Sequence, residues 1–145
     1  MNDTNTVSPP VGVVIVTHTD YGTKLLQAAE FIIGAQENCQ CVSVDVTYEV
    51  SQTLETLTKA VKATDKGGGV MILTDMFGGT PTNISLSLLG SHRLEVVTGV
   101  NLPMLIKILS SRTKPLEQLA GDAKTAGVQG IVVAGEVLRK KVAGE

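Results

Sequence analysis

Three short polar segments in this 145-residue sequence hold the side chains best suited to chemistry. His18 begins the segment His-Thr-Asp-Tyr-Gly, Asp75 begins Asp-Met-Phe-Gly-Gly-Thr-Pro-Thr-Asn, and Gly99 begins Gly-Val-Asn. A neutral imidazole is a good nucleophile near pH 7 when one ring nitrogen is free and the ring is held in place. A carboxylate on the other nitrogen fixes the tautomer and stabilises the cationic ring that forms on attack. The pairing of His18 with Asp75 therefore predicts phosphoryl transfer through histidine.

The residues after Asp75 suit a phosphoryl group. Gly78 and Gly79 offer bare backbone N–H groups, and Thr80 is expected to be the N-cap of a short helix whose positive end favours an anion. The hydroxyls of Thr80 and Thr17 are expected within reach of the phosphoryl oxygens. We therefore predict His18 as the nucleophile, Asp75 as its orienting partner, and four phosphate-binding residues: Gly78, Gly79, Thr80 and Thr17.

Each of these residues also has a plain structural interpretation. His18 could be an ordinary polar loop residue, Asp75 could cap the following turn, and the Gly-Gly pair could only permit a tight backbone path. The joint occurrence of all three features directly after predicted strands favours the chemical interpretation. The second histidine, His92, precedes a predicted strand and is expected at the opposite edge of the sheet.

The elements that must position these segments alternate between strand and helix. Apolar, largely β-branched runs typical of buried strands cover residues 11–17, 41–46, 70–74, 94–98 and 128–133, and the segments between the first four carry helical spacing. This alternation predicts an α/β fold with an open, mostly parallel sheet and helices on both faces, for which we expect the strand order 2-1-3-4. In such sheets a ligand binds at the carboxyl ends of the strands, where all three polar segments begin.

The composition indicates one folded domain. Hydrophobic residues make up 43% of the chain and charged residues 18%, as in ordinary globular proteins. Residues 1–10 end in Ser-Pro-Pro and are expected to form a disordered tail, which leaves 11–145 as the domain. The net charge of −2 and the presence of only four aromatic residues argue against nucleic-acid binding.

The two cysteines indicate a reducing compartment. Cys39 and Cys41 are too close for an ordinary disulfide and have no further ligands at metal-site spacing. No apolar run reaches the length of a membrane span, and the N-terminus lacks the features of a signal peptide. We expect a cytoplasmic protein that needs neither a metal nor an organic cofactor.

Together the motifs resemble the enzyme IIA component of the mannose-type (mannose/fructose/sorbose family) sugar phosphotransferase system. The resemblance rests on residues 14–18, 74–83 and 97–105, and covers about residues 11–135 in order. It implies a phosphotransferase that accepts a phosphoryl group from the histidine-containing phosphocarrier protein onto Nε2 of His18. The group then passes to a IIB component during sugar uptake, so contact with the membrane is only indirect, through a permease complex.

The resemblance also implies a homodimer in which the C-terminal strand, here residues 128–133, crosses to the partner's sheet. One departure stands beside the nucleophile, because Thr19 occupies a position where the family usually has glycine. A Cβ at this position is expected to restrict the loop or narrow access to the ring. The IIB partner is expected to be a separate protein or to be lacking altogether.

Two other roles are compatible with the same site. The first is a regulatory module whose phosphorylation state reports nutrient supply in an incomplete phosphotransferase system, and the second is a phosphocarrier for a dihydroxyacetone kinase. The stretch Phe-Gly-Gly-Thr-Pro that begins at Phe77 favours the mannose-type branch over the second role. Because a IIA component does not touch the sugar, the identity of the sugar lies outside this chain.

Overall fold

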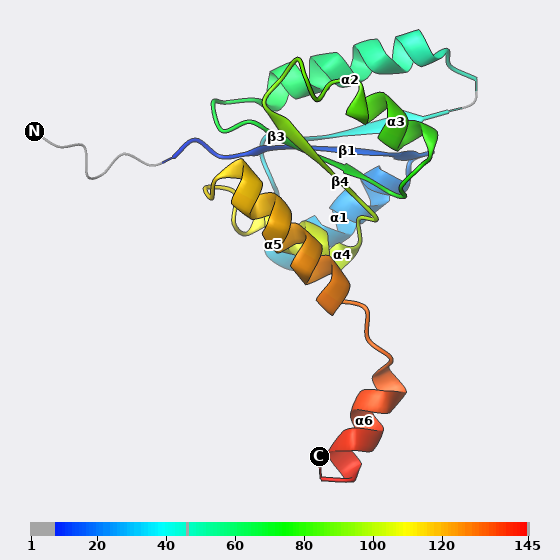
Figure 1. Ribbon diagram of the computed structural model, residues 1–145, viewed down its shortest axis with the longest axis vertical. Helices are drawn as coiled ribbons and strands as arrows, with labels where there is room; N and C mark the ends of the chain where they lie inside the picture. The colour runs from blue at the N-terminus through cyan, green and yellow to red at the C-terminus, as the bar shows by residue number, and fades with distance from the viewer. Residues whose placement is uncertain (1–7, 46, 145) are drawn as a thin grey trace, which may run out of the picture.

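The computed structural model describes residues 8–45 and 47–144, so most of the predicted disordered tail lies outside the described residues. Within them the chain forms four strands and six helices (Figure 1). In chain order these are β1 (Gly12–His18), α1 (Tyr21–Ile33), β2 (Cys39–Val44), α2 (Val50–Thr64), β3 (Val70–Thr74), α3 (Thr80–Leu86), β4 (Leu94–Thr98), α4 (Leu102–Leu109), α5 (Leu116–Gln129) and α6 (Ala134–Val142).

The four strands form one parallel sheet in the order β2-β1-β3-β4, which confirms the predicted fold class and strand order. In the registers, Val16 of β1 lies beside Val42 of β2 and Thr74 of β3, and Thr74 lies beside Thr98 of β4. The carboxyl ends of all four strands therefore reach the same edge of the sheet. Sequence alternation explains the parallel pairing, because each helix returns the chain to the edge where the next strand begins.

Alternate residues of the strands fill two separate cores. Val13 and Ile15 of β1 face the layer of α1, α4 and α5, while Val14 and Val16 face the layer of α2 and α3. All four side chains are fully buried, as expected for a central strand covered on both faces. This alternation decides which helix layer each residue at the end of β1 can contact.

The predicted last strand, residues 128–133, is not formed in the single chain that the structure describes. Val128 and Gln129 are the final residues of α5, Gly130 is its C-cap, and residues 131–133 have no regular secondary structure. Helix α5 continues into the first two residues of the predicted strand. The β-branched residues that follow form a strand only where another strand supplies hydrogen bonds. Residues 131–133 therefore link α5 to α6, which projects away from the rest of the molecule (Figure 1).

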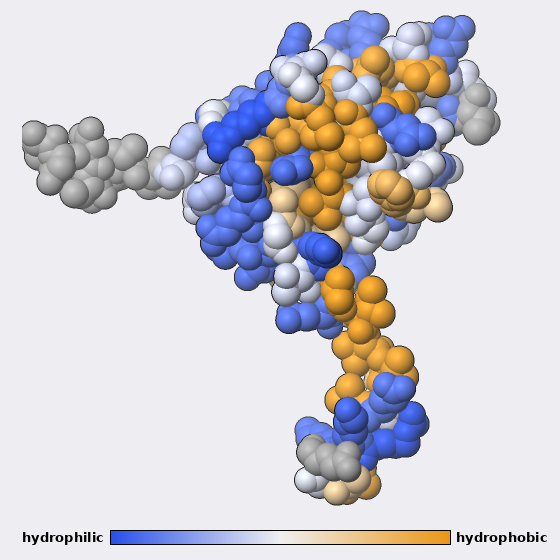
Figure 2. All heavy atoms as spheres, in the orientation of Figure 1, coloured by the Kyte–Doolittle hydropathy of each residue, from blue (hydrophilic) through white to orange (hydrophobic). Residues whose placement is uncertain are grey.

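Apolar side chains are exposed along this C-terminal segment. Ile131, Val132 and Val133 are 77%, 57% and 61% exposed, and Leu138 of α6 is 63% exposed. Figure 2 shows hydrophobic atoms along the link and on α6, and a second hydrophobic area over β4 on the body of the molecule. Among the described helices, none combines the length and the apolar character that crossing a membrane requires.

Candidate active site

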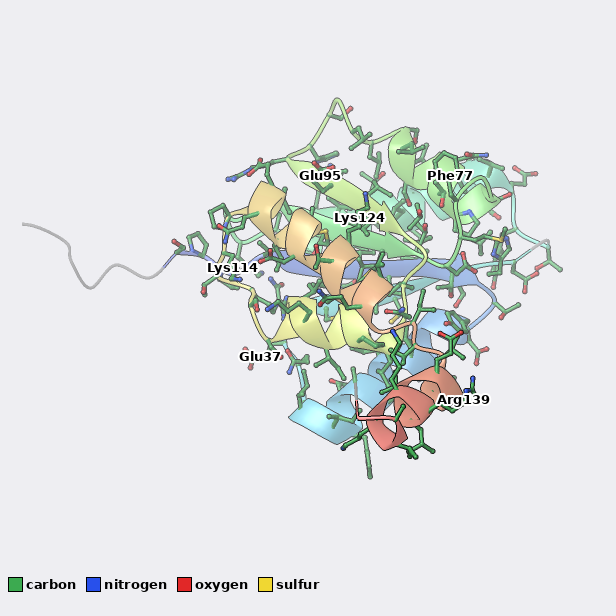
Figure 3. The ribbon with its side chains drawn as sticks, turned by 60° about the horizontal axis from the view of Figure 1, so that its bottom comes forward. Glu37, Phe77, Glu95, Lys114, Lys124 and Arg139 are labelled. Carbon is green, nitrogen blue, oxygen red and sulfur yellow. The ribbon has the colours of Figure 1, made fainter. Side chains whose placement is uncertain are left out.

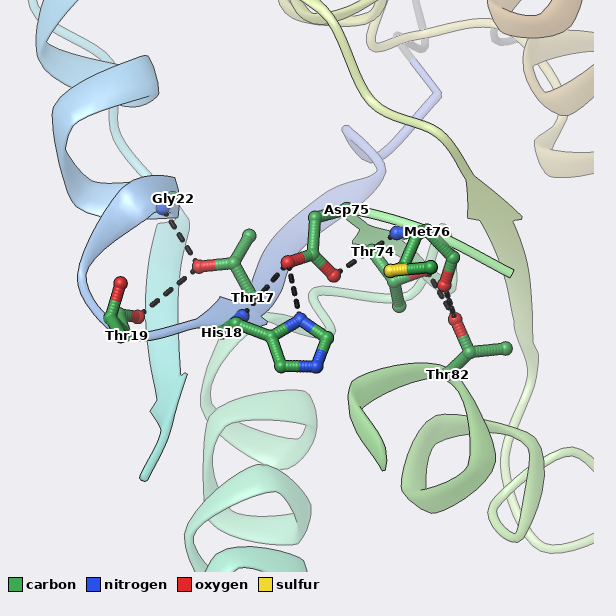
Figure 4. A network of polar contacts seen from close by, with 8 residues as sticks. All are labelled: Thr17, His18, Thr19, Gly22, Thr74, Asp75, Met76 and Thr82. Carbon is green, nitrogen blue, oxygen red and sulfur yellow. Dashed lines mark hydrogen bonds and ion pairs between the residues drawn. The ribbon is translucent and has the colours of Figure 1, made fainter. Parts of the chain in front are cut away.

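His18 and Asp75 meet at the carboxyl edge of the two central strands. His18 is the last residue of β1, and Asp75 directly follows Thr74, the last residue of β3. Since Val16 is level with Thr74 in the β1–β3 register, His18 and Asp75 leave the sheet at nearly the same height. Figure 4 shows the Asp75 carboxylate beside the imidazole ring. The structure thus brings together the predicted nucleophile and its predicted partner.

One carboxylate oxygen of Asp75 holds His18 twice. Asp75 Oδ2 accepts a hydrogen bond from the backbone N–H of His18 at 3.0 Å and lies 2.7 Å from ring atom Nδ1. The other oxygen, Oδ1, accepts from the backbone N–H of Met76 at 3.0 Å. With Nδ1 on the carboxylate, the opposite ring nitrogen, Nε2, is the one left for chemistry. The His18 side chain is 48% exposed, whereas that of Asp75 is 18% exposed.

The environment keeps Asp75 ionised. Partial burial by itself raises the pKa of the Asp75 carboxyl, but the hydrogen bonds from the backbone and ring of His18 and the charge of that ring outweigh this effect. The net result is a pKa below the ordinary value of 3.8. Asp75 is therefore a carboxylate at neutral pH, which is the form that orients an imidazole and stabilises it when it becomes cationic.

Gly79 lies directly against the Nε2 side of the ring. A Cβ at this position would sit 2.9 Å from His18 Cε1 and 3.4 Å from His18 Nε2. Gly78 has a φ of +88°, in the region that glycine adopts without strain. Glycine is therefore required at these two positions for different reasons: Gly78 permits the turn, and Gly79 leaves room for the ring.

Thr80 and Thr17 differ from their predicted positions. Thr80 is the first helical residue of α3, and Gly79 is the N-cap, so the predicted cap is one residue too late. Thr17 is 1% exposed and points into the α1 layer, where its hydroxyl accepts from the N–H of Gly22 at 2.8 Å and donates to the carbonyl of Thr19 at 3.3 Å. The hydroxyl of Thr17 is thus used in the turn before α1, and Thr17 is not brought to the other residues that were predicted to bind phosphate.

Thr19 adopts the backbone conformation that glycine would favour. Its φ is +51°, which is rare for a β-branched residue, and its N–H donates to the carbonyl of Val44 at 3.1 Å. With the Thr17 bond to its carbonyl, both backbone groups of Thr19 are held. The expected restriction of the loop at this position therefore takes the form of a strained residue fixed by two hydrogen bonds.

The third polar segment reaches the same edge, and the hydrogen bonds of Val100 and Asn101 go to other parts of the chain than the ring. Val100 N–H donates to the carbonyl of Thr74 at 3.0 Å, which ties this segment to the end of β3. Asn101 is the N-cap of α4: its Oδ1 accepts from Met104 N–H, and its Nδ2 donates to the carbonyl of Gly127 in α5. Its role is structural. His92 lies in the turn before β4, at the opposite edge of the sheet.

Sequence reasoning did not single out the hydroxyls of Thr74 and Thr82, which form a buried pair beneath the Asp75 turn (Figure 4). The sequence did offer one signal for this pair. Thr74 ends a buried strand, where a hydroxyl cannot bond to water and must find a hydrogen-bond partner within the protein. Among the residues that the structure describes, no group of three His, Cys, Asp or Glu side chains could hold a metal ion.

Apolar side chains surround the site on the outer surface. Phe77 and Met76, in the turn after β3, are 76% and 55% exposed. Tyr48, shortly before α2, and Tyr21, the first residue of α1, are 59% and 46% exposed. Figure 3 shows Phe77 at the opposite end of the sheet from Lys114. The ring of His18 thus lies in a surface that offers large apolar side chains to a macromolecule.

Known proteins are similar to this chain over most of its length. The family model described as "PTS system fructose IIA component" matches residues 12–126. The "PTS system fructose-specific EIIA component" of Bacillus subtilis (strain 168) is 30% identical over 132 residues, which are 90% of this chain and 90% of that protein. The "PTS system mannose-specific EIIAB component" of Escherichia coli (strain K12) is 30% identical over 124 residues, which are 83% of this chain but 38% of that protein.

Solved structures share the fold. The structure of phosphotransferase system component EIIA from Streptococcus agalactiae has a TM-score of 0.80 at 27% identity and covers 87% of this chain and 98% of its own. The mannose/sorbose specific IIA subunit from Enterococcus faecalis has a TM-score of 0.79 at 24% identity, with 86% and 95% covered. The latter likeness concerns the fold alone.

Proposed function

The chain belongs to the family of PTS fructose IIA components, and we propose that within it His18 is the residue that carries the phosphoryl group. The observation that supports this assignment best is the 2.7 Å contact between Asp75 Oδ2 and His18 Nδ1 in a ring that is half exposed. This contact directs one nitrogen into the protein and leaves Nε2 for a macromolecular donor. Mannose-type IIA components have a phosphocarrier role in sugar transport, and His18 is the group in this chain with the required geometry.

The proposed transfer is a substitution at phosphorus. The lone pair of His18 Nε2 forms the new N–P bond while the bond from phosphorus to the donor's histidine nitrogen breaks, and its electron pair returns to the donor ring. The Nδ1 proton stays on His18, hydrogen-bonded to Asp75, and the ring carries the resulting positive charge. Transfer to a IIB component reverses the step, because the cationic ring is a good leaving group. No cofactor takes part in either direction.

Gly78, Gly79 and Thr80 are the proposed ligands of the phosphoryl oxygens. Gly79 lies close to the ring, since the place where its Cβ would stand is 3.4 Å from Nε2. Backbone N–H groups at the start of α3 and the Thr80 hydroxyl supply hydrogen-bond donors on that side of the ring. Thr17 has no part in this proposal, because its hydroxyl is used inside the α1 turn.

The proposed donor is the histidine-containing phosphocarrier protein, and the proposed acceptor is a IIB component. At the carboxyl edge, residues 18–22, 45, 47–50, 75–80 and 99–101 contain four Asp or Glu and no Lys or Arg. A partner that brings a phosphoryl group in a basic setting would complement this charge, and exposed Phe77 and Met76 would supply apolar contact. Both partners must use this face, since it is the one that reaches Nε2.

A homodimer belongs to the same proposal. The outer edge of β4 has no strand beside it in the described part of the chain, and residues 131–133 are exposed and apolar. Pairing of this segment with the β4 edge of a second copy would cover both surfaces and complete the backbone hydrogen bonds of an open edge. The exchanged segment is then shorter than the predicted strand 128–133 and begins after Gly130.

The decisive experiment is phosphorylation by the donor carrier. The purified chain, incubated with the phosphorylated histidine carrier, should gain one acid-labile phosphoryl group. His18→Ala should abolish this adduct, whereas His92→Ala, which removes the only other histidine, should retain it. An adduct of unchanged yield in His18→Ala would refute the assignment.

Addition of candidate IIB proteins then separates transport from regulation. Loss of the label from this chain and its appearance on a IIB protein are the results expected for a transport component. Stable retention of the label with every IIB candidate would favour the regulatory role, and transfer to the machinery of a dihydroxyacetone kinase would favour the third role.

A further inference from the structure

A buried hydroxyl outside the predicted site links the two segments that lie on either side of the His18 ring. Thr82, in the first turn of α3, is fully buried, and so is Thr74 at the end of β3. Thr82 Oγ1 lies 2.7 Å from Thr74 Oγ1 and donates to the carbonyl oxygen of Met76 at 2.6 Å. Figure 4 shows this contact beneath the turn that carries Asp75. A single oxygen atom of α3 thus bonds to both residues that flank Asp75.

The direction of these hydrogen bonds follows from the number of protons. A hydroxyl has one proton to donate, and Thr82 uses it on the Met76 carbonyl. The bond between the two threonines therefore runs from Thr74 Oγ1 as donor to Thr82 Oγ1 as acceptor. The hydrogen bonds therefore run in one direction, from Thr74 to Thr82 and from Thr82 to Met76. They tie the two ends of the turn around Asp75 together from inside the protein.

Closure of this turn fixes where the carboxylate points. Asp75 stands between the two tethered residues, and its Oδ2 accepts the bonds from the backbone and ring of His18. Thr82 also belongs to the helix that starts beside Gly79, whose backbone lies against Cε1 and Nε2 of the same ring. Asp75 lies on the Nδ1 side of the imidazole and Gly79 on the Nε2 side, and the Thr82 hydroxyl is bonded within the structure that carries both.

We propose that Thr82 is a positioning residue for phosphoryl transfer at His18, because its hydroxyl sets the spacing between the Asp75 carboxylate and Gly79. This role rests on the function proposed for His18 and concerns the orientation of the ring rather than contact with the phosphoryl group. Without the hydroxyl, the turn 75–79 gains freedom relative to α3, and the ring loses the arrangement that leaves Nε2 unprotonated and open to the donor.

The test compares Thr82→Val, which keeps the shape and removes the hydroxyl, with Thr82→Ser, which keeps the hydroxyl. Phosphorylation of His18 by the carrier should slow by about tenfold to a hundredfold in Thr82→Val at saturating carrier, with an unchanged KM for the carrier. Thr82→Ser should retain most of the rate. Rescue by serine distinguishes the hydroxyl from the packing of the side chain.

Ring ¹⁵N spectra of His18 supply a readout that does not depend on activity. In the native chain the signals of the neutral ring should show the proton on Nδ1, as the bond to Asp75 requires. In Thr82→Val they should move toward a mixture of the two tautomers. Thr64→Val is the matched control, because it removes an equally buried threonine hydroxyl that bonds to the Ala60 carbonyl in α2. It should leave both rate and spectrum unchanged.

The outcomes separate this proposal from the function on which it rests. Native rate and native ring signals in a folded Thr82→Val variant would overturn the role of Thr82 while leaving His18 as the phosphorylated residue. Absence of phosphorylation in the native chain would overturn the function, and the ring spectra would still decide the positioning role. If Thr82→Val does not fold, Thr74→Val removes the donor of the same network, and native ring signals in that variant would overturn the proposal.

Discussion

At the scale of single residues, Asp75 combines partial burial of a charge with several hydrogen bonds. Its carboxylate accepts from the backbone and ring of His18 and from the N–H of Met76, although it is largely removed from solvent. The hydrogen bonds favour the ionised form more than burial disfavours it, so the pKa of Asp75 is lowered. A group of this kind links the geometry of the site to the stability of the fold.

Asp75→Asn should slow phosphorylation of His18 on the order of 100-fold, because the amide keeps the shape but not the charge that stabilises the cationic ring. The same change should alter the pH dependence of stability. Since folding lowers the pKa of Asp75, its stabilising contribution is present above its ordinary pKa of 3.8 and is lost as the pH falls through the lowered value.

Urea unfolding of both proteins between about pH 7 and pH 3 measures this contribution. The free energy of unfolding of Asp75→Asn should fall less steeply on the acid side than that of the native chain. Parallel curves for the two proteins would contradict the coupling between Asp75 and folding.

Gly79→Ala tests the closeness of the backbone to Nε2. The added Cβ would stand 2.9 Å from His18 Cε1, so the ring must move away from Asp75 or from the start of α3. We expect phosphorylation to fall by at least about tenfold, as for other small misplacements of a reacting group. Gly90→Ala is the control: a Cβ there meets nothing within 4 Å, and rate and stability should stay close to native.

At the scale of elements, the N-terminus of α1 depends on a residue of the strand before it. Asp20, at the N-cap position, makes no side-chain cap bond, and the Thr17 hydroxyl instead accepts from Gly22 N–H at 2.8 Å. One buried hydroxyl therefore joins the end of β1 to the start of α1 and also holds the carbonyl of Thr19. This arrangement shapes the loop that carries His18 out of the sheet.

Thr17→Val should lower the free energy of unfolding by about 1–2 kcal/mol, because it leaves the buried Gly22 N–H without its acceptor. Asp20→Ala should change it by less than about 0.5 kcal/mol, as expected for an exposed residue without a cap bond. Urea unfolding at neutral pH measures both. Equal stability of Thr17→Val and the native chain would contradict the capping role of Thr17.

At the scale of the whole molecule, the body and the C-terminal segment have different surfaces. The body buries its apolar strands between two helix layers, whereas the link 131–133 and α6 expose most of their apolar side chains. Such exposure on a projecting segment is typical of a surface that is covered in an assembly. The β4 edge and this segment are the two surfaces that the proposed exchange would cover together.

Truncation after Gly130 should convert a dimer into a monomer, because it removes the exposed apolar link and α6 together. Sedimentation equilibrium should give twice the chain mass for the full chain and a single chain mass for the truncated one. Ile131→Asp should act in the same direction without shortening the chain, whereas Lys140→Asp, on the polar part of α6, should not. A monomeric full chain at micromolar concentration would contradict the proposed homodimer.

Several features could be derived from the residues alone, because they depend on local patterns. Alternating apolar runs and helical spacing determined the α/β class, and the position of His18 and Asp75 after two strands determined that they would share an edge. The direction of Thr17 was also accessible, since successive residues of a strand point to opposite faces and Thr17 cannot face the same side as His18. The prediction for Thr17 overlooked this rule.

Other features depend on contacts between segments that are distant in the sequence. Whether Asp75 meets His18 through one oxygen, and how near Gly79 lies to Nε2, depends on the register of β1 with β3 and on the seating of α3. The Thr82 network arises in the same way, as a helix residue reaches back to a strand end. The segment 128–133 has strand-like residues, but helix α5 continues through its start, and the remainder has no strand to pair with in a single chain. Local residue types set the elements and the edge of the site, whereas hydrogen bonds and packing between elements decided its working geometry.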